Sequence, residues 1–320
     1  MTMQLSSTAP AAGWRPSGAA LAIAATLAGL AVLPLVVTDA FALDIATRIA
    51  AFALAALSLH VLVGLVGLAS LGHAMFLGVG AYATVLMAQA GIAQGWLHLI
   101  VAALAAAALA LLVGLVAIRT TGAQFIMITL AMAQIVYLLA ASLPLVGGDD
   151  GLRLAARPDY APLPSVEEPI AFYVLAAGLL GLGLVGVAWL KASRAGLILR
   201  GIKSDERRMA ALGHRVALAK LGAFTLAGAM AGIAGVLLAQ QAYYAGPALM
   251  QWMRSGELLI MVIVGGLASV VGPVIGAAAV LLLEEFLSAR TVHWQGLLGL
   301  FVIAVALRRP LWRQLAGWRR

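Results

Sequence analysis

The stretch "SRAGLILRGIKSDERRMAALGHRVALAKLG", residues 193–222, holds much of the charge of an otherwise apolar chain. The chain has 320 residues, of which 64% are hydrophobic, 20 are Lys or Arg and 12 are Asp or Glu. Eight of the 20 basic residues lie between Lys191 and Lys220, together with Asp205 and Glu206. Charge collected into one segment of an apolar chain is typical of a membrane protein whose charged loop lies in water.

Apolar runs lie on both sides of this charged segment. A mean hydropathy of +1.06 lies outside the range of a soluble domain, and a helix needs about 20 mostly apolar residues to cross the hydrocarbon layer. We therefore predict an all-α, polytopic membrane helical bundle of about ten transmembrane helices with glycine-rich broken segments. The apolar runs are 18–38, 46–66, 74–93, 96–118, 122–143, 170–190, 221–243, 256–271, 273–288 and 295–307.

The distribution of Lys and Arg predicts the orientation of the chain. With the N-terminus inside, 15 of the 20 basic residues lie on the cytoplasmic side, and Arg254 is among the few left outside. The opposite orientation would break the positive-inside rule. The predicted parts are a cytoplasmic N-terminal tail (1–17), one transmembrane domain (18–307) with an outer loop (144–169) and a cytoplasmic loop (191–220), and a basic cytoplasmic tail (308–320).

Several kinds of site are excluded or disfavoured by composition. Cysteine is absent, so neither a disulfide framework nor a thiolate metal site can form. The formal net charge is +8, but basic residues that flank membrane spans report topology, so nucleic acid is not expected as a partner. We also expect no catalytic residue, no metal and no cofactor on this chain, and a lipid bilayer as its surroundings.

The charged loop is predicted to form a helix with an apolar face. The residues of this face fall within roughly 40° of one direction at about 100° per residue. Ser204 is a candidate N-cap before Asp205 and Glu206, and Gly213 offers a C-terminal stop. The pattern is compatible with a helix lying on the membrane surface and with a helix inserted into a cytoplasmic partner. The face comprises Ile198, Ile202, Met209, Leu212 and Val216.

Glycine-rich segments interrupt the apolar runs. The stretch from Gly64 to Tyr82 predicts either close helix packing or a broken helix that lines a polar cavity. The "GLAS" of Gly67–Ser70 recurs within Gly265–Ala277, although four shared residues alone do not establish an internal repeat. Acidic residues are sparse within the spans, apart from Glu284 and Glu285 near one end. The chain therefore shows no obvious carboxylate with which to couple transport to an ion gradient.

Four ordered motifs together resemble a known family. They are "SLGHAMFLGVGAY" from Ser70, "FIMITLAMAQIVY" from Phe125 followed by "GGDDGL" from Gly147, the charged loop from Ser193, and "MVIVGGLASVVGPVIGA" from Met261. This set is similar to the permease subunits of ABC importers of the branched-chain amino acid type. The resemblance runs from about residue 45 to 307 and is strongest at the motifs that begin at Ser70 and Ser193.

The resemblance implies a transport subunit of the bacterial inner membrane and not an enzyme. Its expected partners are a second, related permease in a heterodimer, two cytoplasmic ATPase subunits that hold ATP and Mg, and a soluble substrate-binding protein. The implied ATPase-coupling residues are Gly196, Asp205, Glu206, Ala210, Ala211, Leu212 and Gly213. The implied translocation path includes His60, Ser70, His73, Thr129 and Gln134, and Asp149 and Asp150 are implied to dock the binding protein.

Alternatives remain open from the sequence. The outer loop can equally be a rigid, solvated connection or a docking surface. A self-sufficient channel or secondary carrier for a small neutral solute is the main competing function. A membrane enzyme using His60 and His73 would need a further nucleophile or ligand set that the sequence does not show. The sequence does not distinguish among branched-chain amino acids, amides and urea as the solute.

Overall fold

The computed structural model confirms the all-α prediction. Its described residues are 18–36, 39–291, 293 and 295–305, so the predicted tails 1–17 and 308–320 lie outside the described residues. Within the described part of the chain the strands are limited to a two-stranded antiparallel ladder. The ladder joins β1 (Leu152–Arg153) to β2 (Tyr244–Ala245).

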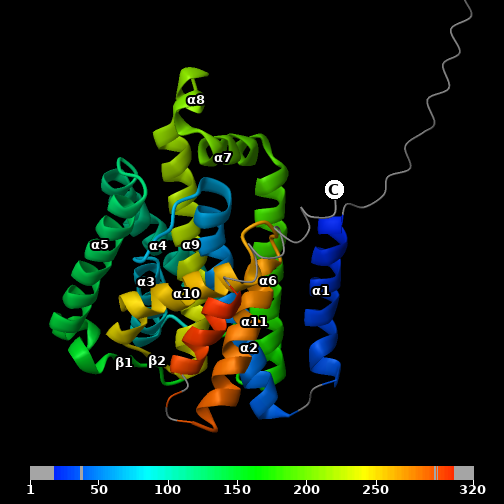
Figure 1. Cartoon of the computed structure of the whole chain (residues 1–320). Coiled ribbons are helices and arrows are strands. Elements are labelled where there is room, and N and C mark those ends of the chain that lie inside the picture. The colour runs from blue at the N-terminus through cyan, green and yellow to red at the C-terminus, as the bar shows by residue number, and fades with distance from the viewer. Residues whose placement is uncertain (1–17, 37–38, 292, 294, 306–320) are drawn as a thin grey trace, which may run out of the picture.

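One helix corresponds to each of the ten predicted apolar runs, in the same order (Figure 1). Their bounds are α1 Gly18–Val36, α2 Ala40–His60, α3 Ala74–Gln89, α4 Gly95–Ala117, α5 Ala123–Ser142, α6 Pro169–Ala192, α9 Val216–Ala242, α10 Trp252–Gly265, α11 Gly272–Ser288 and Gln295–Val305. The connections contain η1 Val61–Val66, η2 Pro144–Val146, η3 Gly148–Asp150, α7 Arg194–Ser204, α8 Glu206–Ala211 and η4 Pro247–Met250.

The number of full-length spans is smaller than ten among the described residues. Six helices are long and apolar enough to cross a membrane: α1, α2 with η1, α4, α5, α6 and α9. The helices α3, α10 and α11 have 16, 14 and 17 residues, which is short of the roughly 20 that a straight span requires. The run 256–271 was predicted as one span, but its helix begins at Trp252 and ends at Gly265.

Small residues allow the central helices α3, α4 and α9 to approach closely. A Cβ added at Gly228 would lie 2.5 Å from Ala110 Cβ, and one at Gly232 would lie 2.6 Å from Ala106 Cβ. A Cβ at Gly80 would collide with the carbonyl of Gly232. This is the small-residue packing on which helix association in lipid depends, so the glycines of α9 serve packing.

Two interruptions confirm the predicted glycine-rich breaks. The first break, Gly67–His73, follows η1, whose π-helical turn changes the register at the end of α2. The second break, Gly266–Val271, separates α10 from α11. Gly67 and Gly266 adopt φ values of +85° and +103°, which residues with side chains rarely adopt. The chain therefore leaves its helices at these two glycines.

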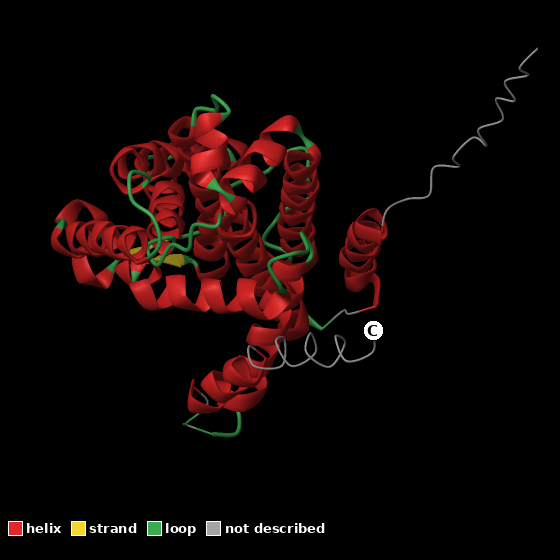
Figure 2. Ribbon diagram, turned by 45° about the horizontal axis from the view of Figure 1, so that its top comes forward, coloured by secondary structure: helices red, strands yellow, loops and turns green. Residues whose placement is uncertain are grey.

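The charged loop and the outer loop lie at opposite ends of the bundle. Figure 1 shows α7 and α8 at one end and the β1–β2 ladder near the other. Figures 1 and 2 both place α1 at the edge of the molecule, and no α1 residue is buried. One contact to α6 is a hydrogen bond of 2.9 Å from the Tyr173 hydroxyl to the Leu30 carbonyl.

Candidate functional site

The charged loop folds as two helices and not as one. The first, α7, begins after Ser193, whose Oγ accepts from Gly196 N at 3.2 Å. It buries Gly196, Leu199 and Ile202. A Cβ at Gly196 would collide with the Leu190 carbonyl, so glycine is required where α7 folds back onto the end of α6. The coupling role predicted for Gly196 thus falls on a residue that sets the corner between α6 and α7.

The second helix, α8, is separated from α7 by Asp205, whose backbone is extended at φ −158° and ψ 99°. The Asp205 side chain accepts from Arg208 N at 3.0 Å, so Asp205 is the N-cap that Ser204 was predicted to be. Ser204 is instead the last residue of α7. The prediction of a single apolar face from Ile198 to Val216 is wrong for the same reason. The extended residue Asp205 separates the two helices, so apolar residues before and after it do not share one helical face.

Helix α8 has no buried residue and projects from the end of the bundle (Figure 1). Ala210 and Ala211 are exposed, and Leu212, just past its end, is 67% exposed. Gly213 then adopts φ +85° and stops the helix as predicted. An uncovered helix end with an exposed leucine is a surface that a partner can cover.

Two contacts hold α8 in place. The carboxylate of Glu206 accepts from the ammonium of Lys220 in α9 at 2.6 Å, and the Lys220 side chain is only 2% exposed. A Cβ at Gly201 would lie 2.6 Å from Met209 Sδ, so Met209 packs directly against the α7 backbone. The predicted coupling residue Glu206 therefore faces the bundle and neutralises a buried lysine.

Four of the five predicted path residues surround the first break. His73 Nε2 lies 2.7 Å from Ser58 Oγ, and a Cβ at Gly72 would collide with the Thr129 carbonyl. Ser70 Oγ accepts from Gly72 N at 3.3 Å, and the His60 ring packs against Gly64 one turn further on. All four side chains are at most 1% exposed, so this conformation encloses them within the bundle.

The fifth path residue, Gln134, lies further along α5 from Thr129. Its Nε2 is buried without a hydrogen-bond partner, as are the Nδ1 atoms of His60 and His73. Buried polar atoms without partners are rare in proteins. The Tyr82 hydroxyl and Thr225 Oγ1 are buried without a partner as well, so these atoms are free to bond to water or to a polar solute.

Two charged pairs inside helices were missed by sequence analysis. Arg254, expected outside, lies in the first turn of α10, where its Nη1 donates to Glu257 Oε2 at 2.7 Å. Arg48 of α2 contacts Glu284 of α11 at 3.4 Å. The i, i+3 spacing of Arg254 and Glu257 was a signal that could have been found. Both carboxylates are neutralised, which argues against either as a free ion-coupling group.

The outer loop is held by Arg157. Its guanidinium donates to the carbonyls of Gln240 and Val166 at 3.1 and 2.9 Å and stacks 3.9 Å above the centroid of the Phe172 ring. Glu167 accepts from the Tyr243 hydroxyl at 2.8 Å, and this bond, with that from Arg157 N, lowers the pKa of Glu167 below its ordinary value of 4.5. These contacts anchor the loop to the bundle, and both alternatives for its role stay open.

A buried polar chain continues inward from this loop. Tyr160 and Gln240 are joined through the tyrosine hydroxyl at 2.8 to 2.9 Å, and Gln240 Nε2 donates to Thr84 Oγ1 at 3.2 Å. Thr84 Oγ1 lies 2.8 Å from His98 Nδ1. Burial raises the pKa of Tyr160 to about 12. Because every member has a partner, this chain fixes α3, α4, α9 and the outer loop together.

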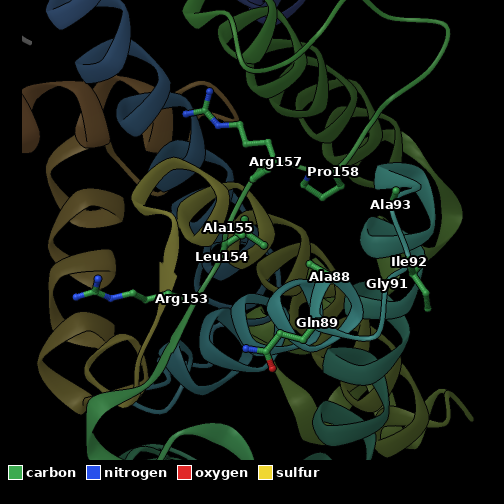
Figure 3. Close-up of a pocket in the computed structure, with 11 residues that line it drawn as sticks. Ala88, Gln89, Gly91, Ile92, Ala93, Arg153, Leu154, Ala155, Arg157 and Pro158 are labelled. Atoms are coloured by element: carbon green, nitrogen blue, oxygen red, sulfur yellow. The ribbon is translucent and has the colours of Figure 1, made fainter.

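The predicted docking residues Asp149 and Asp150 form the exposed end of η3. A nearby cavity of about 340 Å³ lies between the α3–α4 turn and residues 153–158. In Figure 3 the charged ends of Arg153 and Arg157 point away from Ala88 and Ile92, on the other side of this cavity. The cavity is consequently lined mainly by small side chains and backbone, whereas the acidic residues are available on the surface.

Residues 41–307 match the sequence profile of a family described as "Branched-chain amino acid transport system / permease component". The chain belongs to this family. Two similar curated proteins are both called "High-affinity branched-chain amino acid transport system permease protein LivM", from Salmonella typhimurium and Escherichia coli. Each is 27% identical over 291 residues, covering 83% of this chain and 68% of the relative. No solved structure gives a significant match.

Membership in this family accounts for the main features of the fold. The permease is a multi-pass inner-membrane protein and the membrane component of a branched-chain amino acid ABC importer. As a component of such a system it works with ATPase and binding-protein components. The matched range begins within α2 and ends two residues beyond the described helix Gln295–Val305, so α1 lies outside it.

Proposed function

We propose that this permease forms the translocation path for branched-chain or related small amino acids or amides, and that α8 receives the motion of the ATPases. The observation that carries the proposal is α8 itself, a helix without a buried residue that projects from one end of the bundle. The printed names of the two relatives support the class of solute.

The proposed complex contains this chain, a second and related permease, two ATPase subunits and a soluble binding protein. ATP and Mg would be held by the ATPase subunits, and this chain would carry no cofactor and no catalytic residue. The end that carries α8 would be cytoplasmic, with both termini on that side, and Asp149 and Asp150 would face the binding protein.

The proposed path runs past the first break. His60, Ser70, His73 and Thr129 are gathered there, and the Nδ1 atoms of His60 and His73 have no hydrogen-bond partner. In an occluded conformation these groups are enclosed. Opening would have to move α5 away from Gly72, because the Thr129 carbonyl lies directly against it. The path would therefore form by separation of α5 from the first break.

The test is purification of the chain from its native membrane in a gentle detergent, followed by identification of the proteins that co-elute. Two ATPases and a second permease are expected. Reconstitution of this complex with its binding protein should then give ATP-dependent uptake of radiolabelled leucine. A chain that elutes alone, under conditions that preserve a known transporter complex, and that passes solute by itself in liposomes would replace this proposal with the self-sufficient channel or carrier.

A further inference from the structure

The two breaks share a local geometry as well as the sequence "GLAS". In the first break Gly67 N donates to Leu62 O at 2.8 Å, and in the second Gly266 N donates to Val262 O at 3.0 Å. Ser70 Oγ accepts from the amide two residues later at 3.3 Å, and Ser269 Oγ does the same at 3.3 Å. Both glycines have positive φ. Both breaks therefore end a helix at a positive-φ glycine and contain the same serine turn, although the glycine turns differ, with ψ 17° at Gly67 and 131° at Gly266.

The end of a helix leaves carbonyl oxygens without intrahelical partners and carries a partial negative charge. At the first break the Lys203 ammonium donates to Val63 O and Gly64 O at 3.1 and 2.8 Å. At the second break the Lys191 ammonium donates at 2.7 Å to Ala268 O, which lies inside the break and not at the end of α10. Each break thus receives one lysine, and no other lysine of the described chain contacts either of them.

Both lysines come from the charged loop. Lys191 lies in the last turn of α6, just before α7, and Lys203 lies in the last turn of α7. A Cβ at Gly67 would lie 3.0 Å from Lys203 Cγ, so the stem of Lys203 covers Gly67 before its ammonium reaches the carbonyls. Arg200 Nη2 donates to the Lys191 carbonyl at 3.3 Å and so fixes the corner between α6 and α7.

Helix α7 is also the element to which α8 is attached. Met209 of α8 packs on Gly201, and α7 buries Leu199 and Ile202 in the bundle. A short helix with a buried face moves as a unit because packed interiors transmit displacement and do not deform continuously. A push on α8 consequently reaches α7. From α7 it reaches the first break through Lys203, and it reaches the second break through the bond from Arg200 to the Lys191 carbonyl and through Lys191 itself.

We propose that Lys191, at the end of α6, and Lys203, in α7, are positioning residues that tie the α6–α7 corner to the second break and α7 to the first, so that movement of α8 changes both breaks together. This inference rests on the proposed function, in which α8 receives the motion of the ATPases. Neither lysine would touch the solute. Their role would be to make opening of the path depend on ATP hydrolysis.

The experiment uses the whole complex in proteoliposomes and compares leucine uptake with ATP hydrolysis stimulated by the binding protein. Loss of charge-assisted hydrogen bonds in Lys203→Met should reduce uptake about tenfold while ATP hydrolysis stays within roughly twofold of the unsubstituted complex. Lys203→Arg should restore uptake. Lys191→Met should have a smaller effect, since it removes one hydrogen bond and not two. Arg194→Met is the matched control, because it removes one exposed charge from α7.

A second readout does not depend on the solute. The chain has no cysteine, so Ala69→Cys places a single thiol within the first break. We expect ATP binding to change the labelling rate of this thiol severalfold, and Lys203→Met to abolish that change while ATP hydrolysis continues. Equal uptake in Lys203→Met, or parallel loss of assembly, ATP hydrolysis and uptake, would overturn the inference. If the unsubstituted permease purifies without any ATPase, the proposed function is overturned instead.

Discussion

The two charged loops of the permease use their arginines in opposite ways. In the outer loop Arg157 is enclosed between Phe172 and Tyr243, and its donors bond to backbone carbonyls. In the charged loop Arg207 and Arg208 are exposed, and Arg208 contacts only its neighbour Asp205, at 3.7 Å. Arg157 stabilises the fold, whereas Arg207 and Arg208 are left for something outside the chain.

The difference teaches that a charged loop must be judged by its contacts and not by its composition. A six-residue helix is too short to be stable alone, so α8 depends on the Asp205 cap, Met209 and the Glu206–Lys220 pair. Those contacts use only one side of α8 and leave the rest uncovered. The outer loop by contrast bonds to Gln240 in α9 and to Tyr243 just past its end, and Arg157 stacks on Phe172 of α6.

The largest expected effect is on the uncovered helix. Ala210→Pro removes a backbone donor and costs the helix about 3 kcal/mol, so uptake by the reconstituted complex should fall at least about a hundredfold. The isolated chain should remain folded in detergent, because α8 buries nothing. The control Ala210→Ser keeps the donor and should transport normally. Normal uptake by the proline variant would remove α8 from the coupling route.

The next effect is on the outer loop. Arg157→Ala leaves the Val166 and Gln240 carbonyls without a donor and removes the stacking on Phe172, for a combined loss of about 3 kcal/mol in the free energy of unfolding. Thermal unfolding of the purified permease measures this loss. Arg153→Ala is the matched control and should change stability by less than about 0.5 kcal/mol. Equal melting temperatures for both variants would mean that the outer loop is not held by Arg157.

A smaller loss of stability is expected where α8 meets the bundle. Glu206→Gln leaves the Lys220 ammonium, which is 2% exposed, without a counter-charge, and should cost about 2 kcal/mol because Glu206 itself is partly exposed to water. Chemical unfolding in detergent measures the difference, with the exposed Arg207→Gln as control. If the two variants unfold alike, the pair contributes nothing to the fold. A Glu206→Arg substitution would also remove this counter-charge, so it would change both the stability of the fold and the coupling to the ATPases. Ala210→Pro is therefore the cleaner test of docking.

The smallest effect concerns pH. Because the folded pKa of Glu167 lies below its ordinary value of 4.5, ionised Glu167 contributes stability above that value, and the contribution is lost as pH falls through the folded pKa. Between pH 5 and pH 3, an interval of about two units around the ordinary value, the melting temperature of the unsubstituted protein should therefore drop more than that of Glu167→Gln. Parallel pH profiles for the two proteins would show that Glu167 is not linked to stability.

Much of the arrangement was predictable because hydropathy and helix-breaking residues act locally. The order of the ten apolar helices, the glycine breaks and the helix stop at Gly213 all followed from short patterns. The division between α7 and α8 did not, since Asp205 can continue a helix or cap a new one, and only the contacts of Met209 and Lys220 select the cap. Glu257 was missed because it lies one helical turn from Arg254, near the start of an apolar run, and charged residues at the end of a membrane span are ordinary.

By itself the sequence determined that this is a helical membrane protein, which family motifs it carries and where its charge is collected, since these depend on composition and order along the chain. Only the tertiary structure decided which charges are used internally. It brought Lys191 and Lys203 to two breaks that are far apart in sequence, and it set Arg157 between two aromatic rings. Such contacts join residues that no local periodicity relates, so they depend on how the helices pack.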